Sequence, residues 1–325
     1  MTASPASEFP DTIKYLAAKM PGFSPGKRRN DNVAAILDCQ STPIGRRKME
    51  TESEERFAFG RNWQSFAGSI GPERIDQAVE SLKSMLGVES LDGRRFLDIG
   101  CGSGLFSLAA HRLGAEVVSV DFDLDSVACT QEIRNRYASE DAWEVRQGSV
   151  LDEPFMESLG QADVVYCWGV VHHSGEMHRA IEMVSKLVCE GGRLYLSVYN
   201  DQGGASRRWL AIKRTYNWLP RFLRPLWVSL IAGFYETKFA LARLASGKNP
   251  LPFADWRRKK EDRGMSAWHD WVDWVGGLPF EVASPEAIIV PLRRRGFVLD
   301  NLKTVQGGWG CNEYVFTRHD STQSP

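Results

Sequence analysis

The chain has 325 residues, of which 43% are apolar and 25% are charged, and its formal net charge is -1. This composition is ordinary for a soluble globular protein, and the balanced charge gives no general argument for nucleic-acid binding. The six cysteines form no Cys-x-x-Cys pair, and the N-terminus carries no apolar signal segment. We therefore expect free thiols, no metal site and a cytoplasmic location.

Proline, glycine and charge patterns divide the chain into four regions. Residues 1–50 are rich in proline and basic clusters and predict a peripheral arm. Residues 51–200 predict the first part of an α/β core, and residues 201–285 predict a helical cap inserted into it. Residues 286–325 predict the last core strands and a short tail.

The first core segment is a helix candidate that is rich in aromatic residues. Residues 54–66 place Phe59, Trp63 and Phe66 at helical spacing, which is typical of core packing. Residues 73–86 follow, with apolar side chains on one stripe, and predict an amphipathic helix.

A glycine-rich turn organises the rest of the chain. Residues 95–99 predict a short buried strand and residues 105–113 a helix, with Gly100, Gly102 and Gly104 between them. Glycine allows a sharp turn and a close approach of the backbone to a ligand, beside the free N–H groups of a helix start. Asp98 precedes the turn, where a carboxylate would repel a pyrophosphate. The pattern therefore favours a cationic ligand.

A second strand, residues 116–121, ends in an acid. Asp121 lies about 20 residues beyond the glycines, where nucleotide-binding sheets hydrogen-bond a ribose diol. A dinucleotide-binding dehydrogenase is an alternative, but the spacing lacks the third glycine of Gly-x-Gly-x-x-Gly.

Together these residues resemble the class I S-adenosylmethionine-dependent methyltransferases of the small-molecule type. The resemblance covers about Trp63 to Asn200 and resumes in the last strands. It implies an α/β fold with a seven-stranded, mostly parallel, doubly wound Rossmann-like sheet, and S-adenosyl-L-methionine as the cofactor. It implies that the glycine turn passes the methionine portion, that Asp121 holds the ribose hydroxyls and that Phe122 flanks the adenine. The residues assigned to the cofactor are Trp63, Asp98, Gly100, Gly102, Asp121, Phe122, Ser149, Val150 and Trp168.

The remaining core elements follow the same alternation of helix and strand. We expect helices at residues 126–137 and 177–188, and strands at residues 143–146, from 162 to about 168, 193–200, 296–302 and 307–316, the last of them antiparallel. A tight turn at Gly191-Gly192 is expected to precede the fifth strand.

The cap concentrates the positive charge of the chain. Residues 201–263 contain 14 Lys or Arg and 5 Asp or Glu, and helices are expected at residues 206–218 and 226–245. The cations are solvated, or they face an anionic or lipid-like acceptor, or they contact a membrane surface together with the tryptophans. Nucleic acid is disfavoured because no binding motif is visible and no DPPY-like tetrapeptide follows the fourth strand.

Methyl transfer requires alignment of donor and acceptor, exclusion of water and, for a hydroxyl acceptor, removal of a proton. Histidine suits that role, and the candidates are His172, His173 and His269, although a pair such as His172-His173 also serves to position other groups. The candidates for acceptor contact are Tyr199, Asn200 and Trp271. The sequence thus predicts methylation of a small molecule, most simply at a hydroxyl oxygen. A methyltransferase acting on RNA or protein and a non-catalytic binder of the cofactor are the alternatives, and the oligomeric state is left open.

Overall fold

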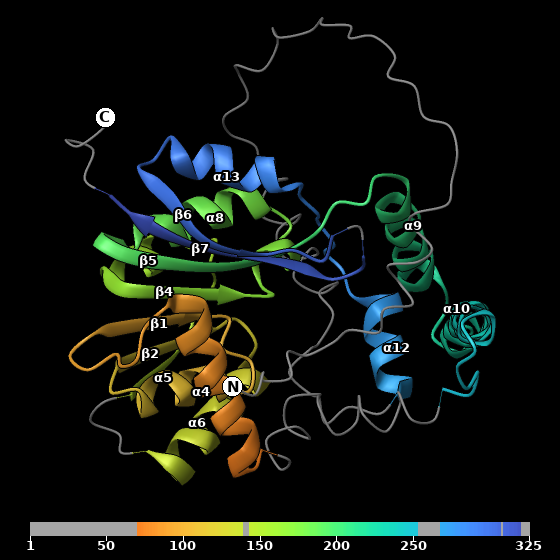
Figure 1. Cartoon of the computed structure of the whole chain (residues 1–325), viewed down its shortest axis with the longest axis horizontal. Coiled ribbons are helices and arrows are strands. Elements are labelled where there is room, and N and C mark those ends of the chain that lie inside the picture. The colour runs from red at the N-terminus through yellow and green to blue at the C-terminus, as the bar shows by residue number, and fades with distance from the viewer. Residues whose placement is uncertain (1–69, 139–142, 253–266, 307, 320–325) are drawn as a thin grey trace, which may run out of the picture.

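The computed structural model describes residues 70–138, 143–252, 267–306 and 308–319. A seven-stranded sheet forms its centre, in the order β3-β2-β1-β4-β5-β7-β6 (Figure 1). The strands are β1 Arg95–Ile99, β2 Glu116–Asp121, β3 Trp143–Gln147, β4 Ala162–Trp168, β5 Val188–Tyr199, β6 Phe297–Lys303 and β7 Cys311–Arg318. Strands β1 to β5 pair in parallel, and β7 is antiparallel to both of its neighbours. The predicted fold class is confirmed.

Both faces of the sheet are covered by helices, because the strand residues alternate between two cores. Phe96 of β1 joins one buried cluster, whereas its neighbours Leu97 and Ile99 join the other. The Phe96 face is covered by α4 Pro72–Leu86, α5 Leu105–Arg112 and α6 Leu124–Tyr137. The opposite face is covered by α7 Glu153–Ser158, α8 Met177–Lys186 and α13 Pro285–Arg293.

Local sequence signals set the helix ends. Helix α4 begins at Pro72, where the missing N–H of proline costs nothing, and ends at Gly87 in the left-handed conformation with φ of 64°. Helix α6 is capped by Asp123, whose side chain accepts the N–H of Asp125. The cap at Asp123 fixes the start of α6 directly after the end of β2.

The predicted cap is a separate group of helices beside the carboxyl ends of the parallel strands (Figure 1). It comprises α9 Gly204–Trp218, α10 Arg224–Ala245 and α12 Ala267–Gly276. Its own aromatic cluster includes Trp209 and Tyr235 and receives Trp309 from the segment between β6 and β7. In the described part of the chain, no helix is long and apolar enough to cross a bilayer.

Two expectations from the sequence need correction. The helix expected at residues 177–188 ends at Lys186, and β5 begins at Val188. Gly191-Gly192 is therefore not a turn ahead of the strand; it lies inside β5, where the pairing with β4 shifts register and Gly191 has φ of 71°. The sequence also did not predict α7, α13 or the 3-10 helix η2 Val171–His173.

Some expectations fall outside the described residues. These are the arm at residues 1–50, Trp63 with its aromatic segment, and the tail at residues 320–325. The five cysteines that the structure describes carry free thiols, as predicted.

Candidate active site

The glycine turn connects β1 to α5 through three residues with positive φ. Gly100 has φ of 84°, and a Cβ there would lie 2.1 Å from Cγ2 of Val170, in the loop that leaves β4. Gly102 has φ of 54°, and its N–H donates to Oδ2 of Asp121 over 2.9 Å. Only glycine allows this backbone to lie so close to the β4 loop and to the end of β2.

Asp121 holds the turn from the neighbouring strand. Its Oδ1 accepts the N–H of Asp123 at 2.9 Å, while Oδ2 accepts the N–H of Gly102. Burial raises the pKa of this carboxyl, and the backbone N–H groups of Asp123, Gly102 and Phe122 oppose that rise. A carboxylate oxygen accepts more than one hydrogen bond, so the group retains acceptor capacity for hydroxyl donors such as a ribose diol.

Asp98 lies behind the turn, in the core. It is 1% exposed, and the hydroxyl of Ser107 donates to its Oδ2 at 2.5 Å. Trp143 Nε1 donates to Ser119 Oγ at 2.7 Å, and Ser119 lies 2.7 Å from Ser107 Oγ. Because an indole N–H only donates, this chain directs its hydrogens toward Asp98. Burial nevertheless raises the pKa of Asp98 to about 7, with Ser107 opposing and the charge of Asp121 adding to the rise.

The other residues predicted to contact the cofactor lie along the same carboxyl edge of the sheet. Phe122, 48% exposed, follows β2 directly, and Trp168, 42% exposed, ends β4. Ser149 and Val150 follow β3, where Ser149 Oγ accepts the N–H of Leu151 at 3.2 Å. The fold thus brings all of the described cofactor candidates to one edge; their contacts with a ligand stay a prediction.

The two histidines after β4 pack against Tyr199 at the end of β5. The His172 ring centre lies 3.9 Å from that of Tyr199, and the His173 ring meets it edge-on at 5.5 Å. His172 is 1% exposed, burial lowers its pKa far below the usual value, and its Nδ1 has no partner among the described residues. It is a neutral core residue.

His173 has a fixed tautomer. Its Nδ1 lies 2.7 Å from the carbonyl oxygen of Pro279, so this nitrogen carries the hydrogen and donates it. Nε2 is then the basic nitrogen of the ring. Burial lowers the pKa of His173 to about 4, and the bond to Pro279 opposes that shift. The imidazole is therefore neutral at physiological pH and able to accept a proton.

A buried lysine from the cap lies near this pair. Lys213 on α9 is 1% exposed, and its Nζ donates to the carbonyl oxygen of Trp274 at 2.6 Å. Nζ also lies 4.9 Å from the ring centre of Phe280 and 5.9 Å from that of Trp274. Burial lowers the pKa of Lys213 to about 7, and the charge of Asp273 opposes the shift.

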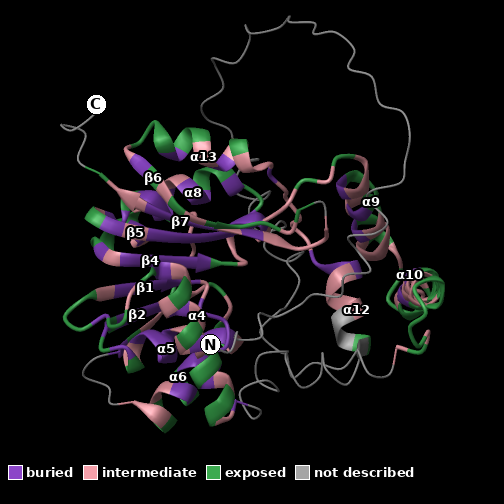
Figure 2. Cartoon of the chain, viewed as in Figure 1, coloured by how far each residue is buried: buried purple, intermediate pink, exposed green. Residues whose placement is uncertain are grey.

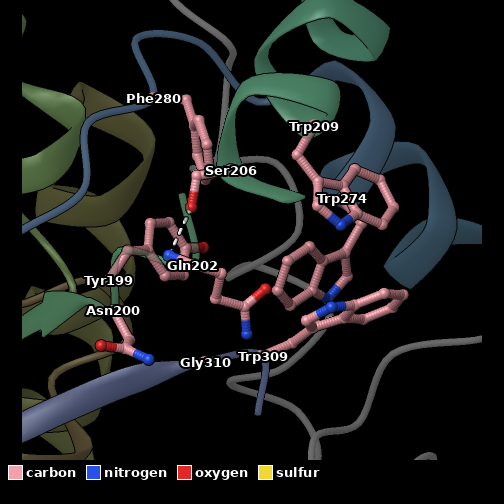
Figure 3. A pocket seen from close by; sticks show the side chains of 9 residues that line it. All are labelled: Tyr199, Asn200, Gln202, Ser206, Trp209, Trp274, Phe280, Trp309 and Gly310. Carbon is pink, nitrogen blue, oxygen red and sulfur yellow. Dashed lines mark hydrogen bonds between the residues drawn. The ribbon is translucent and has the colours of Figure 1, made fainter. Parts of the chain in front are cut away.

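An aromatic recess lies between the sheet edge and the cap. It is small, with about 20 Å³ in which the centre of a water-sized molecule can lie, and it is partly open to solvent. Figure 3 shows Trp209, Trp274 and Trp309 together on the side away from Tyr199 and Asn200. The indole N–H of Trp209, itself 3% exposed, has no partner among the described residues.

The residues predicted to contact an acceptor divide between this recess and the cap interior. Tyr199 and Asn200 line the recess, and Asn200 Oδ1 accepts from Asn312 at 3.1 Å. Trp271 instead donates its indole N–H to Glu236 at 3.2 Å and stacks on Tyr235, which ties α12 to α10. The side chain of His269 lies outside the described residues. All of these assignments stay predictions.

Sequence reasoning missed several residues of the recess. Phe280 and Trp309 were not assigned to it, and neither was the adjoining Lys213. One signal was present in the sequence, because Ser206, Trp209 and Lys213 share a helical face and are the buried residues of α9. A lysine on the buried face of a helix points to an unusual environment.

The sequence matches a family model described as a methyltransferase domain over residues 72–245. Curated relatives include ubiquinone biosynthesis O-methyltransferases. The protein from Rhizobium rhizogenes is 28% identical over 53% of this chain and 73% of its own length. The protein from Aeromonas salmonicida is 27% identical over 46% and 62%, and the one from Bordetella avium is 32% identical over 41% and 51%. This chain therefore spans between about half and three quarters of the length of these relatives.

Solved structures of similar fold include an O-methyltransferase family protein from Burkholderia thailandensis. It has a TM-score of 0.45 and 14% identity, over 76% of this chain and 59% of that one. The magnesium protoporphyrin IX methyltransferase from Synechocystis PCC 6803 has a TM-score of 0.44 and 16% identity, over 87% and 90%.

Proposed function

Because this chain belongs to the methyltransferase-domain family, and is therefore an enzyme of the methyltransferase class, we propose that it methylates a hydroxyl oxygen of a small-molecule acceptor. S-adenosyl-L-methionine is the donor. When bound, it supplies an electrophilic methyl group on a positively charged sulfur. The curated relatives named as O-methyltransferases support oxygen as the methylated atom.

One observation carries the donor assignment: the turn from Gly100 to Gly104 is fastened to the partly buried carboxylate of Asp121 at the carboxyl edge of parallel strands. A Cβ at Gly100 would collide with the side chain of Val170, so only glycine fits at this point of the turn. A carboxylate at Asp121 suits a cationic ligand, and Asp98 adds only part of a charge near neutral pH because burial raises its pKa to about 7. These features fit a sulfonium nucleoside and argue against a diphosphate.

We assign the proton-accepting role to His173. The Pro279 carbonyl fixes the hydrogen on Nδ1, so Nε2 is the nitrogen that accepts a proton from the acceptor hydroxyl. A neutral ring is available throughout the physiological range because burial lowers the pKa to about 4. Buried His172 packs between His173 and Tyr199 and positions them.

The recess supports a ring-bearing or apolar acceptor. Its walls combine indole and phenyl rings, which contact planar or apolar groups well, with the polar side chains of Asn200, Gln202 and Ser206. Lys213, next to two of those rings, offers an N–H donor to a polar group of the acceptor, since burial lowers its pKa to about 7 and favours the neutral amine.

The donor assignment is tested by calorimetry with S-adenosylhomocysteine. Asp121→Ala should weaken its affinity by roughly 30-fold or more, since both the ribose acceptor and the anchor of Gly102 are lost. Asp123→Ala is the control, because it removes the cap of α6 and leaves Asp121 in place; it should change affinity less than about threefold. Equal affinity of Asp121→Ala and the unaltered chain would refute the placement of the donor.

The acceptor class is tested with labelled donor and size-fractionated cell extract. Label in the small-molecule fraction supports the proposal, and label confined to polymer would favour RNA or protein methylation. Donor binding without any formation of S-adenosylhomocysteine would favour a non-catalytic binder.

A further inference from the structure

Helix α10 is apolar on two opposite sides. One side packs into the cap through Val228, Ile231 and Tyr235. On the other side Leu226, Leu230, Phe234 and Leu241 are between 58% and 65% exposed. At 3.6 residues per turn these four lie within an arc of about 80°. A helix that is apolar on both sides requires cover on both sides, and the cap covers only one.

The exposed stripe extends beyond α10. Trp218, at the end of α9, is 82% exposed, and Phe222, in the connecting turn, is 79% exposed. Trp218, Phe222, Leu226, Leu230 and Phe234 follow each other at intervals of four residues. We call these five residues and Leu241 the outer face. In Figure 1, α10 lies on the far side of the cap from the sheet, and Figure 2 shows it largely exposed.

The charge around the outer face is almost entirely positive. Residues 202–252 contain nine Lys or Arg and a single acid, Glu236. That acid accepts the indole N–H of Trp271, on the cap side of α10. Six of the cations are exposed: Arg207, Arg208, Arg214, Arg221, Lys238 and Lys248. The surface is thus apolar in the middle and basic around it.

We propose that the outer face docks this chain on an anionic lipid bilayer, with α10 lying in the interface. Tryptophan, phenylalanine and leucine beside lysine and arginine suit the boundary between acyl chains and anionic headgroups. The described helices include none that could span the bilayer, so the contact is peripheral.

Charge argues against the two other partners that could cover the outer face, a second copy of the chain and the N-terminal segment. A symmetric dimer through the outer face would bring one basic surface against another, which repels. Residues 1–69 contain ten Lys or Arg and eight Asp or Glu, so that segment offers no negative surplus to match the cations. A bilayer supplies both an apolar layer and negative charge.

The test is co-sedimentation of the full chain with vesicles. Vesicles of phosphatidylglycerol mixed with phosphatidylcholine should bind it, vesicles of phosphatidylcholine alone should bind it much less, and about 0.5 M salt should weaken the binding. The double variant Phe222→Glu with Phe234→Glu should require at least about tenfold more lipid for half-binding, because two apolar anchors become charged. The matched control, Val290→Glu with Val298→Glu, alters two exposed apolar residues of the core and should bind like the unaltered chain.

Two further measurements separate this proposal from its rivals. All variants should keep their affinity for S-adenosylhomocysteine, which shows that the fold and the donor site are intact. Absence of vesicle binding by the full chain, or unchanged binding by the Phe222 and Phe234 variant, overturns the proposal. A stable dimer in sedimentation velocity that this variant dissociates would assign the outer face to a second copy instead.

Discussion

At the scale of single residues, the site combines buried ionisable groups whose pKa values are shifted in different directions. Burial raises the pKa of Asp98 to about 7 and lowers that of Lys213 to about 7 and that of His173 to about 4. Each shift favours the neutral form of the group, since a low-polarity interior penalises charge. The fold can bury these polar groups because each keeps a hydrogen-bond partner. Asp98 bonds to Ser107, Lys213 to the Trp274 carbonyl and His173 to the Pro279 carbonyl.

Lys213 gives a prediction about stability and pH. Its folded pKa is about 7 and its ordinary value is 10.5, so between these values the unfolded chain binds a proton that the folded chain has released. The free energy of unfolding should therefore rise with pH in that window, by roughly 2–3 kcal/mol from pH 7 to pH 9 for this group alone. Lys213→Met should remove that rise.

Urea denaturation at several pH values measures the effect. Arg214→Met, at the next position of α9 and exposed, is the matched control and should keep the slope of the unaltered chain. If the free energy of unfolding changed with pH in the same way for the unaltered chain and for Lys213→Met, Lys213 would not titrate in this window.

At the scale of elements, the glycine turn and the loop after β4 restrict each other. Gly100 and Gly169 both have positive φ, 84° and 77°, but only Gly100 faces a neighbour, Val170. Substitution of these two glycines by alanine therefore separates two losses of stability. One comes from the strained backbone conformation, and the other from a steric clash between side chains.

Gly100→Ala should destabilise the fold by roughly 2–4 kcal/mol, because a new Cβ meets a stiff β-branched side chain at 2.1 Å. A Cβ at Gly169 would have no neighbour within 4 Å, so Gly169→Ala should lower the free energy of unfolding by only about 1 kcal/mol. Chemical denaturation of both variants provides the comparison. Addition of Val170→Ala should recover part of the loss at Gly100; no recovery would mean that the collision is not the cause.

The elements also show what the sequence can and cannot predict. The strands around Gly100 and Asp121 were predictable, since apolar runs, glycines and terminal acids are local signals. The contact of Lys213 with Trp274 joins residues 61 positions apart, and Trp309 reaches the cap from a loop near the end of the chain. Such contacts depend on tertiary packing, which no local pattern encodes. The bulge at Gly191 was mistaken for a turn because both use a glycine with positive φ.

At the scale of the whole molecule, charge is divided between two parts. Residues 201–263 carry a surplus of nine positive charges, whereas the whole chain is at -1. The rest of the chain is therefore strongly acidic. A molecule with one basic end orients in the field of an anionic surface, and the same end attracts anionic small molecules. The division places the basic cap beside the recess, and Asp98 and Asp121 at the glycine turn where we propose that the donor binds.

One indole of the core segment enters the aromatic cluster of the cap. Trp309, between β6 and β7, meets Trp209 edge-on at 5.1 Å and Tyr235 at 4.8 Å, inside the aromatic cluster of the cap. Truncation to alanine at such a position costs about 3–5 kcal/mol. We expect Trp309→Ala to loosen the cap while the sheet keeps its stability, because the core strands do not depend on this ring.

Hydrogen exchange distinguishes the two parts. In Trp309→Ala, amides of α9 and α10 should exchange at least about tenfold faster, and those of β1 and β4 should be unchanged. Trp268→Ala is the control, because it removes an indole of α12 that is 43% exposed. The amides of the cap and of the sheet should then exchange at nearly the same rates as in the unaltered chain. If exchange became equally faster in the cap and in the sheet, the two parts would unfold as a single unit. Trp309 would then stabilise the whole molecule, and not only the position of the cap beside the recess.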